Sequence, residues 1–258
     1  MGPREIASGG EWIYGRNPVE EALAAGRREC VELVLPPLGV GEDDQLSRIR
    51  DEAVSRRIVV RTMRREQLDK LTRFGHHQGV ALKTRGYPYS TMREIMADVA
   101  DDPNAIVVVL DHLEDPQNTG AIIRTACAAG AKGVIIPEDR SCGITPAVVR
   151  ASAGGTEHIK IARVVNIARA IEDMQKAEVW FTGLDWGEDA KNYTDIDFSG
   201  RTGIVVGSEG SGISRLVRKT CDFIAVLPMP GGFESLNASV ATGIALYEVL
   251  RQHSSRRS

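Results

Sequence analysis

Residues 105–137 read AIVVVLDHLEDPQNTGAIIRTACAAGAKGVIIP, and this stretch decides the fold of the larger part of the chain. Two short runs rich in Val and Ile, at 105–110 and 133–137, flank a segment of helical character. Apolar runs of strand length without polar alternation are typical of a sheet that helices cover on both faces. The stretch therefore predicts a β-α-β unit with parallel strands.

The same alternation of apolar strands and helices continues toward the C-terminus. The later strands read HIKIARV (158–164), EVWFTGL (178–184), GIVVG (203–207) and FIAVLPM (223–229). We expect helices near residues 119–130, 144–152, 166–177, 211–219 and 237–252. The pattern predicts an α/β domain with a mostly parallel sheet over residues 104–253, whose ligands bind beyond the carboxyl ends of the strands.

The first 85 residues are built from shorter elements. Asn17 and Pro18 predict a helix start with an N-cap and a proline at the first helical position, and Gly26 ends that helix. The remaining segments suit strands at 31–35, 58–60 and 78–82, a polar helix at 43–56 and a short basic helix. We expect a small α/β domain over 11–85 and a linker over 86–103 that includes the helical segment MREIMADVA.

Composition excludes several classes of protein. The chain has 258 residues, 42% of them hydrophobic, and its longest uninterrupted apolar run, 105–110, is far shorter than the roughly 18–20 residues that span a bilayer. The N-terminus lacks the pattern of a secretory or transit peptide, so a cytoplasmic location and no membrane partner are predicted. The four cysteines lie far apart with no paired spacing, which predicts neither a metal site nor a disulfide framework.

Three loops follow apolar strands at their predicted carboxyl ends. The first holds the turn residues Asp115, Pro116, Asn118 and Gly120, which lead into a helix, and Arg124 near the second turn of that helix. The neighbours of Arg124 are apolar or small, which predicts a largely buried helix in which the guanidinium needs a partner. Taken alone, Asn118 also suits an ordinary capped helix.

The second and third loops are rich in glycine and small polar residues. Residues 205–214 read VVGSEGSGIS and place Glu209 among three glycines, a spacing that matches neither the dinucleotide fingerprint nor the phosphate loop. Residues 227–244 read LPMPGGFESLNASVATGI, in which Ser235 or Asn237 suits a helix N-cap. Each loop alone is weak evidence of a site, but three in succession point to one.

The three loops, in this order and at these separations, resemble the signature motifs of the SpoU (TrmH-like) RNA 2′-O-ribose methyltransferases of the SPOUT superfamily, over nearly all of residues 105–252. The segments YGRNPVEEAL and HHQGVAL resemble the L30e-like substrate-binding domain of the branch that methylates a guanosine of 23S-type rRNA. The resemblance implies a C-terminal trefoil knot, S-adenosylmethionine as cofactor with no metal, a homodimer and a role in rRNA processing. It implies catalytic roles for Arg124, Asn118, Glu209, Ser235 and Asn237, and cofactor contacts from Gly207, Leu227, Leu236, Glu209, Gly210 and Met229.

The net charge of −3 hides an uneven distribution. Residues 1–90 hold 15 basic and 13 acidic residues, whereas residues 91–258 hold 17 and 22. The stretch from residue 56 to residue 85 contains nine basic residues and two acidic ones. A solvated helix face is one interpretation; the other is an RNA-binding surface with strongly salt-dependent binding. The candidates for RNA contact are Arg56, Arg57, Arg61, Arg64, Arg65 and Arg73.

Three other functions compete with methylation of rRNA. The same chemistry on tRNA is the first, and an RNA-binding ribosome-assembly protein without catalysis is the second. The presence of all five catalytic candidates disfavours the second. A doubly wound nucleotide enzyme is the third, and the chain lacks the glycine fingerprint that it needs.

Overall fold

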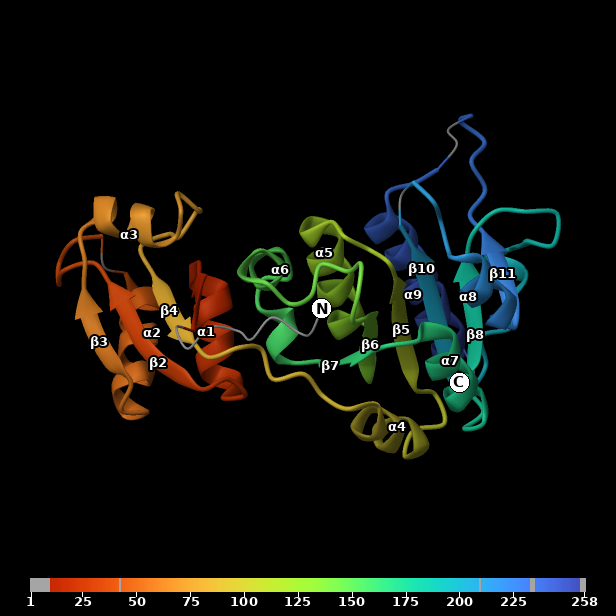
Figure 1. Ribbon diagram of the computed structural model, residues 1–258, viewed down its shortest axis with the longest axis horizontal. Helices are drawn as coiled ribbons and strands as arrows, with labels where there is room; N and C mark the ends of the chain where they lie inside the picture. The colour runs from red at the N-terminus through yellow and green to blue at the C-terminus, as the bar shows by residue number, and fades with distance from the viewer. Residues whose placement is uncertain (1–9, 42, 209, 233–234, 256–258) are drawn as a thin grey trace. The chain divides into compact units, whose positions relative to one another are not determined.

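The computed structural model describes residues 10–41, 43–208, 210–232 and 235–255, and the chain forms two compact units (Figure 1). The first unit takes in the chain up to Pro88 together with Ile144–His158. The second takes in Tyr89–Gly143 and the chain from Ile159 onward. The segment Ile144–His158, which the sequence places within the expected catalytic domain, thus packs with the N-terminal residues.

The first unit is a small α/β structure around a four-stranded sheet. The sheet has the order β1-β4-β2-β3, in which β4 runs antiparallel to both of its neighbours and β2 runs parallel to β3. Its elements are β1 (Glu11–Tyr14), α1 (Arg16–Ala25), β2 (Cys30–Leu35), α2 (Asp44–Ser55), β3 (Val59–Thr62), α3 (Arg65–Leu71), β4 (Ala81–Thr84), α6 (Pro146–Ala151) and the 3₁₀ turn η1 (Gly155–Glu157).

Local details of the first unit differ from the sequence-based expectations. The edge strand β1 was not predicted, and β4 begins three residues later than the expected strand at 78–82 because Gln78 has a φ of 52°, which a strand does not adopt. Helix α1 begins at Arg16 after Gly15, so Asn17 is not its N-cap.

The second unit confirms the predicted parallel sheet. Seven strands run in the order β7-β6-β5-β10-β8-β11-β9, and every pair is parallel. Its elements are α4 (Met92–Ala100), β5 (Ile106–Asp111), α5 (Pro116–Ala128), β6 (Gly133–Pro137), β7 (Lys160–Val164), α7 (Ile167–Gln175), β8 (Trp180–Leu184), β9 (Lys191–Asn192), the 3₁₀ turn η2 (Tyr193–Asp195), β10 (Thr202–Gly207), α8 (Arg215–Thr220), β11 (Phe223–Val226) and α9 (Ala238–Ser255).

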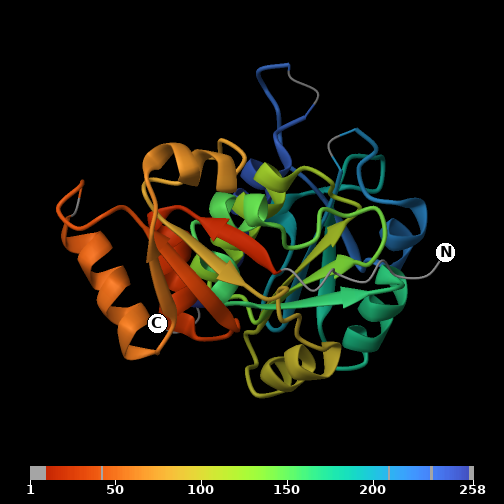
Figure 2. The same cartoon turned by 60° about the vertical axis from the view of Figure 1, so that its left-hand side comes forward.

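Helices cover both faces of this sheet (Figure 2). On one face, buried side chains of the central strands, such as Val107, Val109 and Val205, pack in a single core with α4, α7 and α8. Helices α5 and α9 pack against each other, and α9 also packs on β10. Helix α4 lies in the segment expected as a linker, and its Ile95 and Val99 are fully buried in this core.

Candidate active site

The carboxyl ends of neighbouring strands bring the three sequence-predicted loops to one edge of the sheet. At that edge Asp111, the last residue of β5, pairs in register with Gly207, the last residue of β10. Strand β8 lies on the other side of β10, and β11 follows β8. A fourth loop, which begins with Asp185 after β8, therefore joins the three that the sequence singled out.

The chain turns back on itself after β10. Within this turn the Gly212 amide donates to the carbonyl oxygen of Ser208 at 2.8 Å, and the hydroxyls of Ser208 and Ser211 lie 2.6 Å apart. A Cβ on Gly207 would lie 2.0 Å from the carbonyl oxygen of Gly212, so only glycine fits at position 207. Glu209, a predicted catalytic and cofactor-binding residue of this turn, lies outside the described residues.

A cavity of about 410 Å³ opens at this turn. Its wall combines the ends of β8, β10 and β11 with the start of α9. Five of the six predicted cofactor-binding residues line it, and the catalytic candidate Ser235 does so too: Gly207, Gly210, Leu227, Met229, Leu236 and Ser235.

The cavity has the chemistry that a nucleoside-bearing cofactor needs. Val206, Leu227 and Ala241 give it apolar surface, and the glycine turn offers backbone polar groups. The carboxylate of Asp185 lies against the turn, since a Cβ on Gly212 would be 3.3 Å from its Oδ1. That same Oδ1 accepts a hydrogen bond from the Trp186 amide at 2.8 Å. These residues fit S-adenosylmethionine.

Two of the predicted catalytic residues meet directly. The side chain of Asn237 donates from Nδ2 to Oδ1 of Asn118 at 2.8 Å, which joins the first and third loops across 119 residues of sequence. The amide oxygen of Asn237 also accepts from the backbone of Ser239 at 2.9 Å, at the start of α9. Asn118 is buried, and its own amide donates to Asp115, the N-cap of α5. The start of α9 therefore holds the side chain of Asn237, and the N-cap of α5 holds the backbone of Asn118.

Arg124 lies elsewhere on α5. Its side chain is exposed, in contrast to the buried position that its apolar neighbours indicate, because residues 118 and 124 are about 120° apart around a helix. Within the part of the chain that the structure describes, no hydrogen bond or ion pair involves Arg124. Its guanidinium is free to bind a group that approaches from outside.

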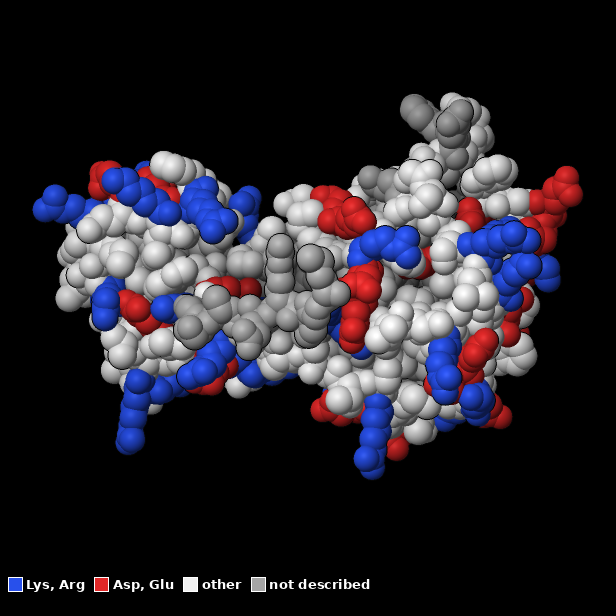
Figure 3. Space-filling view, in the orientation of Figure 1, with Lys and Arg blue, Asp and Glu red and all other residues white. Residues whose placement is uncertain are grey.

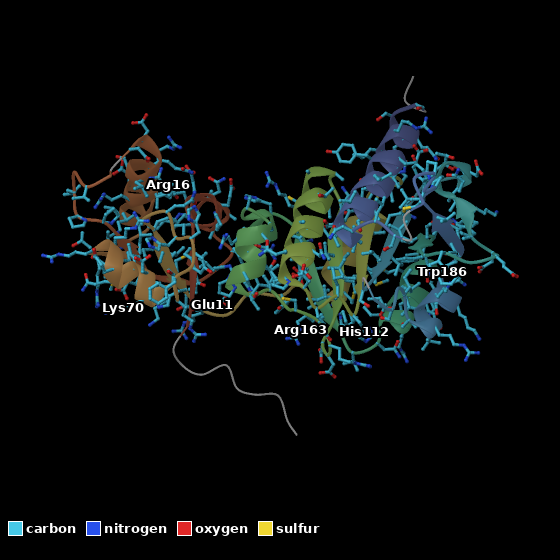
Figure 4. The ribbon with its side chains drawn as sticks, turned by 90° about the horizontal axis from the view of Figure 1, so that it is seen from above. Glu11, Arg16, Lys70, His112, Arg163 and Trp186 are labelled. Carbon is cyan, nitrogen blue, oxygen red and sulfur yellow. The ribbon has the colours of Figure 1, made fainter. Side chains whose placement is uncertain are left out.

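A buried carboxylate ties the first two loops together. Asp111 Oδ2 accepts a hydrogen bond from the amide of Ser214 at 2.6 Å, and Oδ1 lies 2.6 Å from Nδ1 of His112. His112 takes a left-handed φ of 57° directly after β5, and Figure 4 shows it on the second unit. The contact to Asp111 gives His112 a structural role at the end of β5.

A second cavity, of about 910 Å³, shares part of its wall with the first. Ser208, Ser211 and Gly212 line both cavities, and Asn118 lines the second. Three cationic residues and two acidic ones also line it: Arg140, Arg215, Arg218, Glu114 and Asp115. A hydrogen bond from Arg218 to Asp189 lowers the pKa of Asp189 and raises the pKa of Arg218.

The loop after β8 was not among the three loops predicted from the sequence. Trp186 is 80% exposed and, with Asp185, lines the first cavity; Figure 4 labels Trp186. The signal that could have identified them is their position: they directly follow the apolar strand EVWFTGL, at the same edge as the other loops.

The six arginines predicted to bind RNA belong to the first unit and fall into separate groups. Arg56 and Arg61 are ion-paired, with Glu52 at 2.5 Å and Glu32 at 3.0 Å. Arg64 and Arg65 line a groove of about 1080 Å³ beside α3, and Arg73 lies in the loop after that helix. Arg57 lies in the turn between α2 and β3. Lys and Arg side chains gather over α3 in Figure 3.

The described residues show neither a metal-binding cluster nor a membrane-spanning helix. They contain no group of three or more His, Cys, Asp or Glu side chains placed to hold a metal ion. No helix within the described ranges is both long and apolar enough to cross a membrane.

Known proteins resemble both parts of the chain. Residues 105–247 match the SpoU rRNA Methylase family, and residues 12–90 match the family described as RNA 2′-O ribose methyltransferase substrate binding. An uncharacterized tRNA/rRNA methyltransferase from Mycobacterium ulcerans is 42% identical over 94% of this chain and 77% of its own length.

Solved structures give the same result. The AdoMet-bound rRNA methyltransferase from Sinorhizobium meliloti has a TM-score of 0.75 at 29% identity, covering 93% of this chain and 87% of that one. The SpoU methyltransferase AviRb from Streptomyces viridochromogenes has a TM-score of 0.81 at 25% identity, covering 96% and 91%. The second unit thus has the knotted α/β fold of these enzymes, as predicted. From its motifs, its fold and these relatives, the chain belongs to the SpoU rRNA methylase family.

Proposed function

We propose that this chain methylates the 2′-hydroxyl of a guanosine in large-subunit rRNA. The chain is an S-adenosylmethionine-dependent RNA 2′-O-ribose methyltransferase of the SpoU family. One observation carries the assignment of the site: the Asn118–Asn237 hydrogen bond lies next to the glycine turn whose cavity fits the cofactor. The choice of rRNA rests on the substrate-binding match over residues 12–90 and on the full-length likeness to an rRNA methyltransferase.

The reaction is an in-line displacement, so the protein must align the acceptor hydroxyl with the donor methyl group. When bound, S-adenosylmethionine supplies that methyl group as an electrophile. The glycine turn and the start of α9 form the wall against which the cofactor lies. Asn118 and Asn237 hold each other in place beside it and fix the position of the acceptor ribose.

Arg124 acts as an electrostatic partner of the acceptor. An arginine stays protonated in proteins, so it does not serve as a general base. Its fork of N–H donors is suited to hold the ribose or its phosphate and to stabilise the negative charge that develops on the 2′-oxygen. Arg124 is exposed on α5 and has no hydrogen-bond or ion-pair partner among the described residues, which leaves those donors available.

Variants of Arg124 test this division of roles. Arg124→Ala is expected to abolish methyl transfer while S-adenosylmethionine affinity, measured by calorimetry, stays unchanged. Arg124→Lys is expected to remain poor, because a point charge does not reproduce the fork. Arg169→Ala is the matched control, since Arg169 is an exposed helical arginine of the same unit. An equal loss of cofactor affinity in Arg124→Ala would contradict the assignment.

The RNA substrate is tested by mapping ribose methylation on rRNA and tRNA from cells with and without the gene. We expect one guanosine of 23S-type rRNA to lose its 2′-O-methyl group in the deletion strain and to regain it on complementation. Loss of a tRNA methyl group instead would favour the alternative substrate. Failure of the purified protein to bind labelled S-adenosylmethionine would favour a non-catalytic role in ribosome assembly.

A homodimer and a cytoplasmic location are part of the proposal. Three apolar side chains at the start and on the outer side of α9 are solvent-exposed: Leu236 at 39%, Val240 at 50% and Tyr247 at 56%. Val240 and Tyr247 are seven residues apart and share one face of the helix. Tyr247→Asp should shift the mass measured by light scattering toward the monomer, whereas Leu216→Asp, at a 61% exposed position of α8, should not.

A further inference from the structure

The loop between α3 and β4 of the first unit is built in an unusual backbone conformation. Arg73, Phe74 and Gln78 have φ values of 52°, 59° and 52°, in the left-handed region that side chains other than glycine rarely adopt. Non-glycine residues persist there only when the surroundings fix them, and such strain concentrates at functional sites. Three such residues lie within the six residues 73–78 of this loop.

The surroundings do fix the loop. The amide of Phe74 donates to the carbonyl oxygen of Asp69 at 2.6 Å, and the Asp69 carboxylate lies 3.0 Å from Nε2 of the buried His77. Arg16 donates from its backbone amide and its Nε to Gln78, each at 3.2 Å. A Cβ on Gly75 would lie 2.5 Å from the ring of Tyr14, so the loop backbone rests on that ring. The loop is held rigidly.

The rigid loop presents an aromatic ring to solvent. Phe74 is 80% exposed, yet its backbone is held at both ends. Phe74 and His76 lie on the wall of the groove of about 1080 Å³, which also has apolar surface from Pro37, Val40 and Met63. An exposed aromatic ring on a fixed backbone is a surface on which a base can stack at little cost in conformational entropy.

The charge of the groove favours an anionic ligand. Arg16, Arg64 and Arg65 line it together with Glu66 and Asp69. Arg16 is paired with Asp43, and Asp69 with His77, which leaves Arg64 and Arg65 as the cations available to a ligand. Lys70 and Arg73 are neighbours of groove-lining residues in the chain, and Figure 4 shows Lys70 and Arg16 on this unit. Arginine side chains bind phosphate groups, and an aromatic ring beside them can stack with a base. This combination therefore suits a ligand with phosphate groups.

We infer that this groove binds an unpaired nucleotide of the RNA substrate, with its base stacked on Phe74 and its flanking phosphates on Arg64 and Arg65. The inference rests on the proposed function, because it takes the substrate to be RNA. Of the six arginines of the basic segment, Arg64 and Arg65 line this site, whereas the ion-paired Arg56 and Arg61 do not.

Binding of the full-length protein to an in vitro transcript of 23S-type rRNA tests the stacking. Phe74→Ala is expected to weaken binding about 5- to 150-fold, the range for one base stacked on an aromatic side chain. Phe74→Trp should keep wild-type affinity, and Phe74→Leu should not, since Leu has no π face. Val54→Ala is the control, because Val54 is 60% exposed on α2 and does not line the groove.

The salt dependence of binding tests the phosphate contacts. Arg64→Gln and Arg65→Gln should each reduce the slope of log affinity against log salt by about 0.7, as for single-stranded contacts. Phe74→Ala should leave that slope unchanged. Arg48→Gln is the control, since Arg48 is exposed, paired with Glu20 and absent from the groove wall.

Three results would overturn the inference. In the first, Phe74→Ala binds the transcript as tightly as the wild type. In the second, Phe74→Leu binds as well as Phe74→Trp. In the third, the loss in Phe74→Ala occurs only with ribosomal particles and not with naked transcript, which would assign the groove to a protein. Binding that depends on Phe74, without methylation of the transcript by the wild type, would instead refute the proposed function and leave this site standing.

Discussion

Replacement of Glu157 by Gln tests how the segment Ile144–His158 is held in the first unit. Arg28 donates to both carboxylate oxygens of Glu157 at 3.0 Å, and to Glu11 at 2.6 Å. The side chains of Arg28 and Glu157 are both 0% exposed, and the Tyr87 ring lies 4.8 Å from the guanidinium. Solvent therefore screens this pair little.

The expected loss follows from that burial. Removal of one partner of a buried ion pair costs about 3–5 kcal/mol, because the other charge stays buried without compensation. Glu11 remains beside Arg28 in Glu157→Gln, so we expect about 3 kcal/mol, at the lower end. Arg28→Met leaves two carboxylates unpaired and should cost more. The double variant Arg28→Met/Glu157→Gln should lose less than the sum of the two single changes.

Urea unfolding followed by Trp12 fluorescence measures this loss, because Trp12 lies in the first unit and the other two tryptophans lie in the second. Trp180→Phe and Trp186→Phe in the background isolate its signal. Arg85→Gln is the control: Arg85 pairs with Glu29 on the surface of the same unit and should cost at most about 1 kcal/mol. A loss below about 1 kcal/mol in Glu157→Gln, or strict additivity in the double variant, would refute the reasoning.

Four further predictions concern single side chains. Burial raises the pKa of Cys221 to about 12, so the fraction of Cys221 present as thiolate at pH 8 should be about 10³-fold below that of an ordinary thiol. A thiol reagent should therefore modify Cys221 last among the four cysteines of the native protein. Trp186 fluorescence should change on addition of S-adenosylmethionine, whereas a Trp186→Phe variant should lose the response. Gly207→Ala should abolish cofactor binding in calorimetry, since its Cβ would overlap the turn. Burial raises the pKa of Glu11 above its ordinary value of 4.5. A carboxyl group whose pKa is raised by folding contributes stability at low pH, and this stability is lost as the pH rises through the raised value. Glu11→Gln should therefore flatten the pH dependence of the free energy of unfolding just above pH 4.5.

The parallel sheet was predictable because its signal is local. Strands that are buried on both faces must be apolar along their whole length. The runs around Val108, Ile135 and Val205 have this apolar character. The grouping of the three loops also follows from sequence order alone, since parallel strands end at one edge. The match to a known family then supplied the knot, which no periodicity carries.

The contacts that span the chain were not predictable. Strand β1 is four residues long and pairs only with β4, about 70 residues later, so its local pattern is weak. Arg28 and Glu157 lie 129 residues apart, and neither residue type indicates burial without its partner. For the same reason the sequence gives no sign that Ile144–His158 packs with the N-terminal unit rather than with its neighbours in the chain.

Arg124 shows where inference from neighbours fails. Apolar residues on both sides of it indicate a buried helix, and α5 does bury Asn118, Ile122 and Ile123. A helix between a sheet and solvent still has an outer side, and position 124 lies on it. Exposure at position 124 removes the need for a partner inside the protein, because water solvates the guanidinium. Among the described residues Arg124 has no hydrogen-bond or ion-pair partner, and it lies on the helix that also positions Asn118. Its N–H donors are therefore available to a charge that arrives with the substrate, as the role proposed for Arg124 requires.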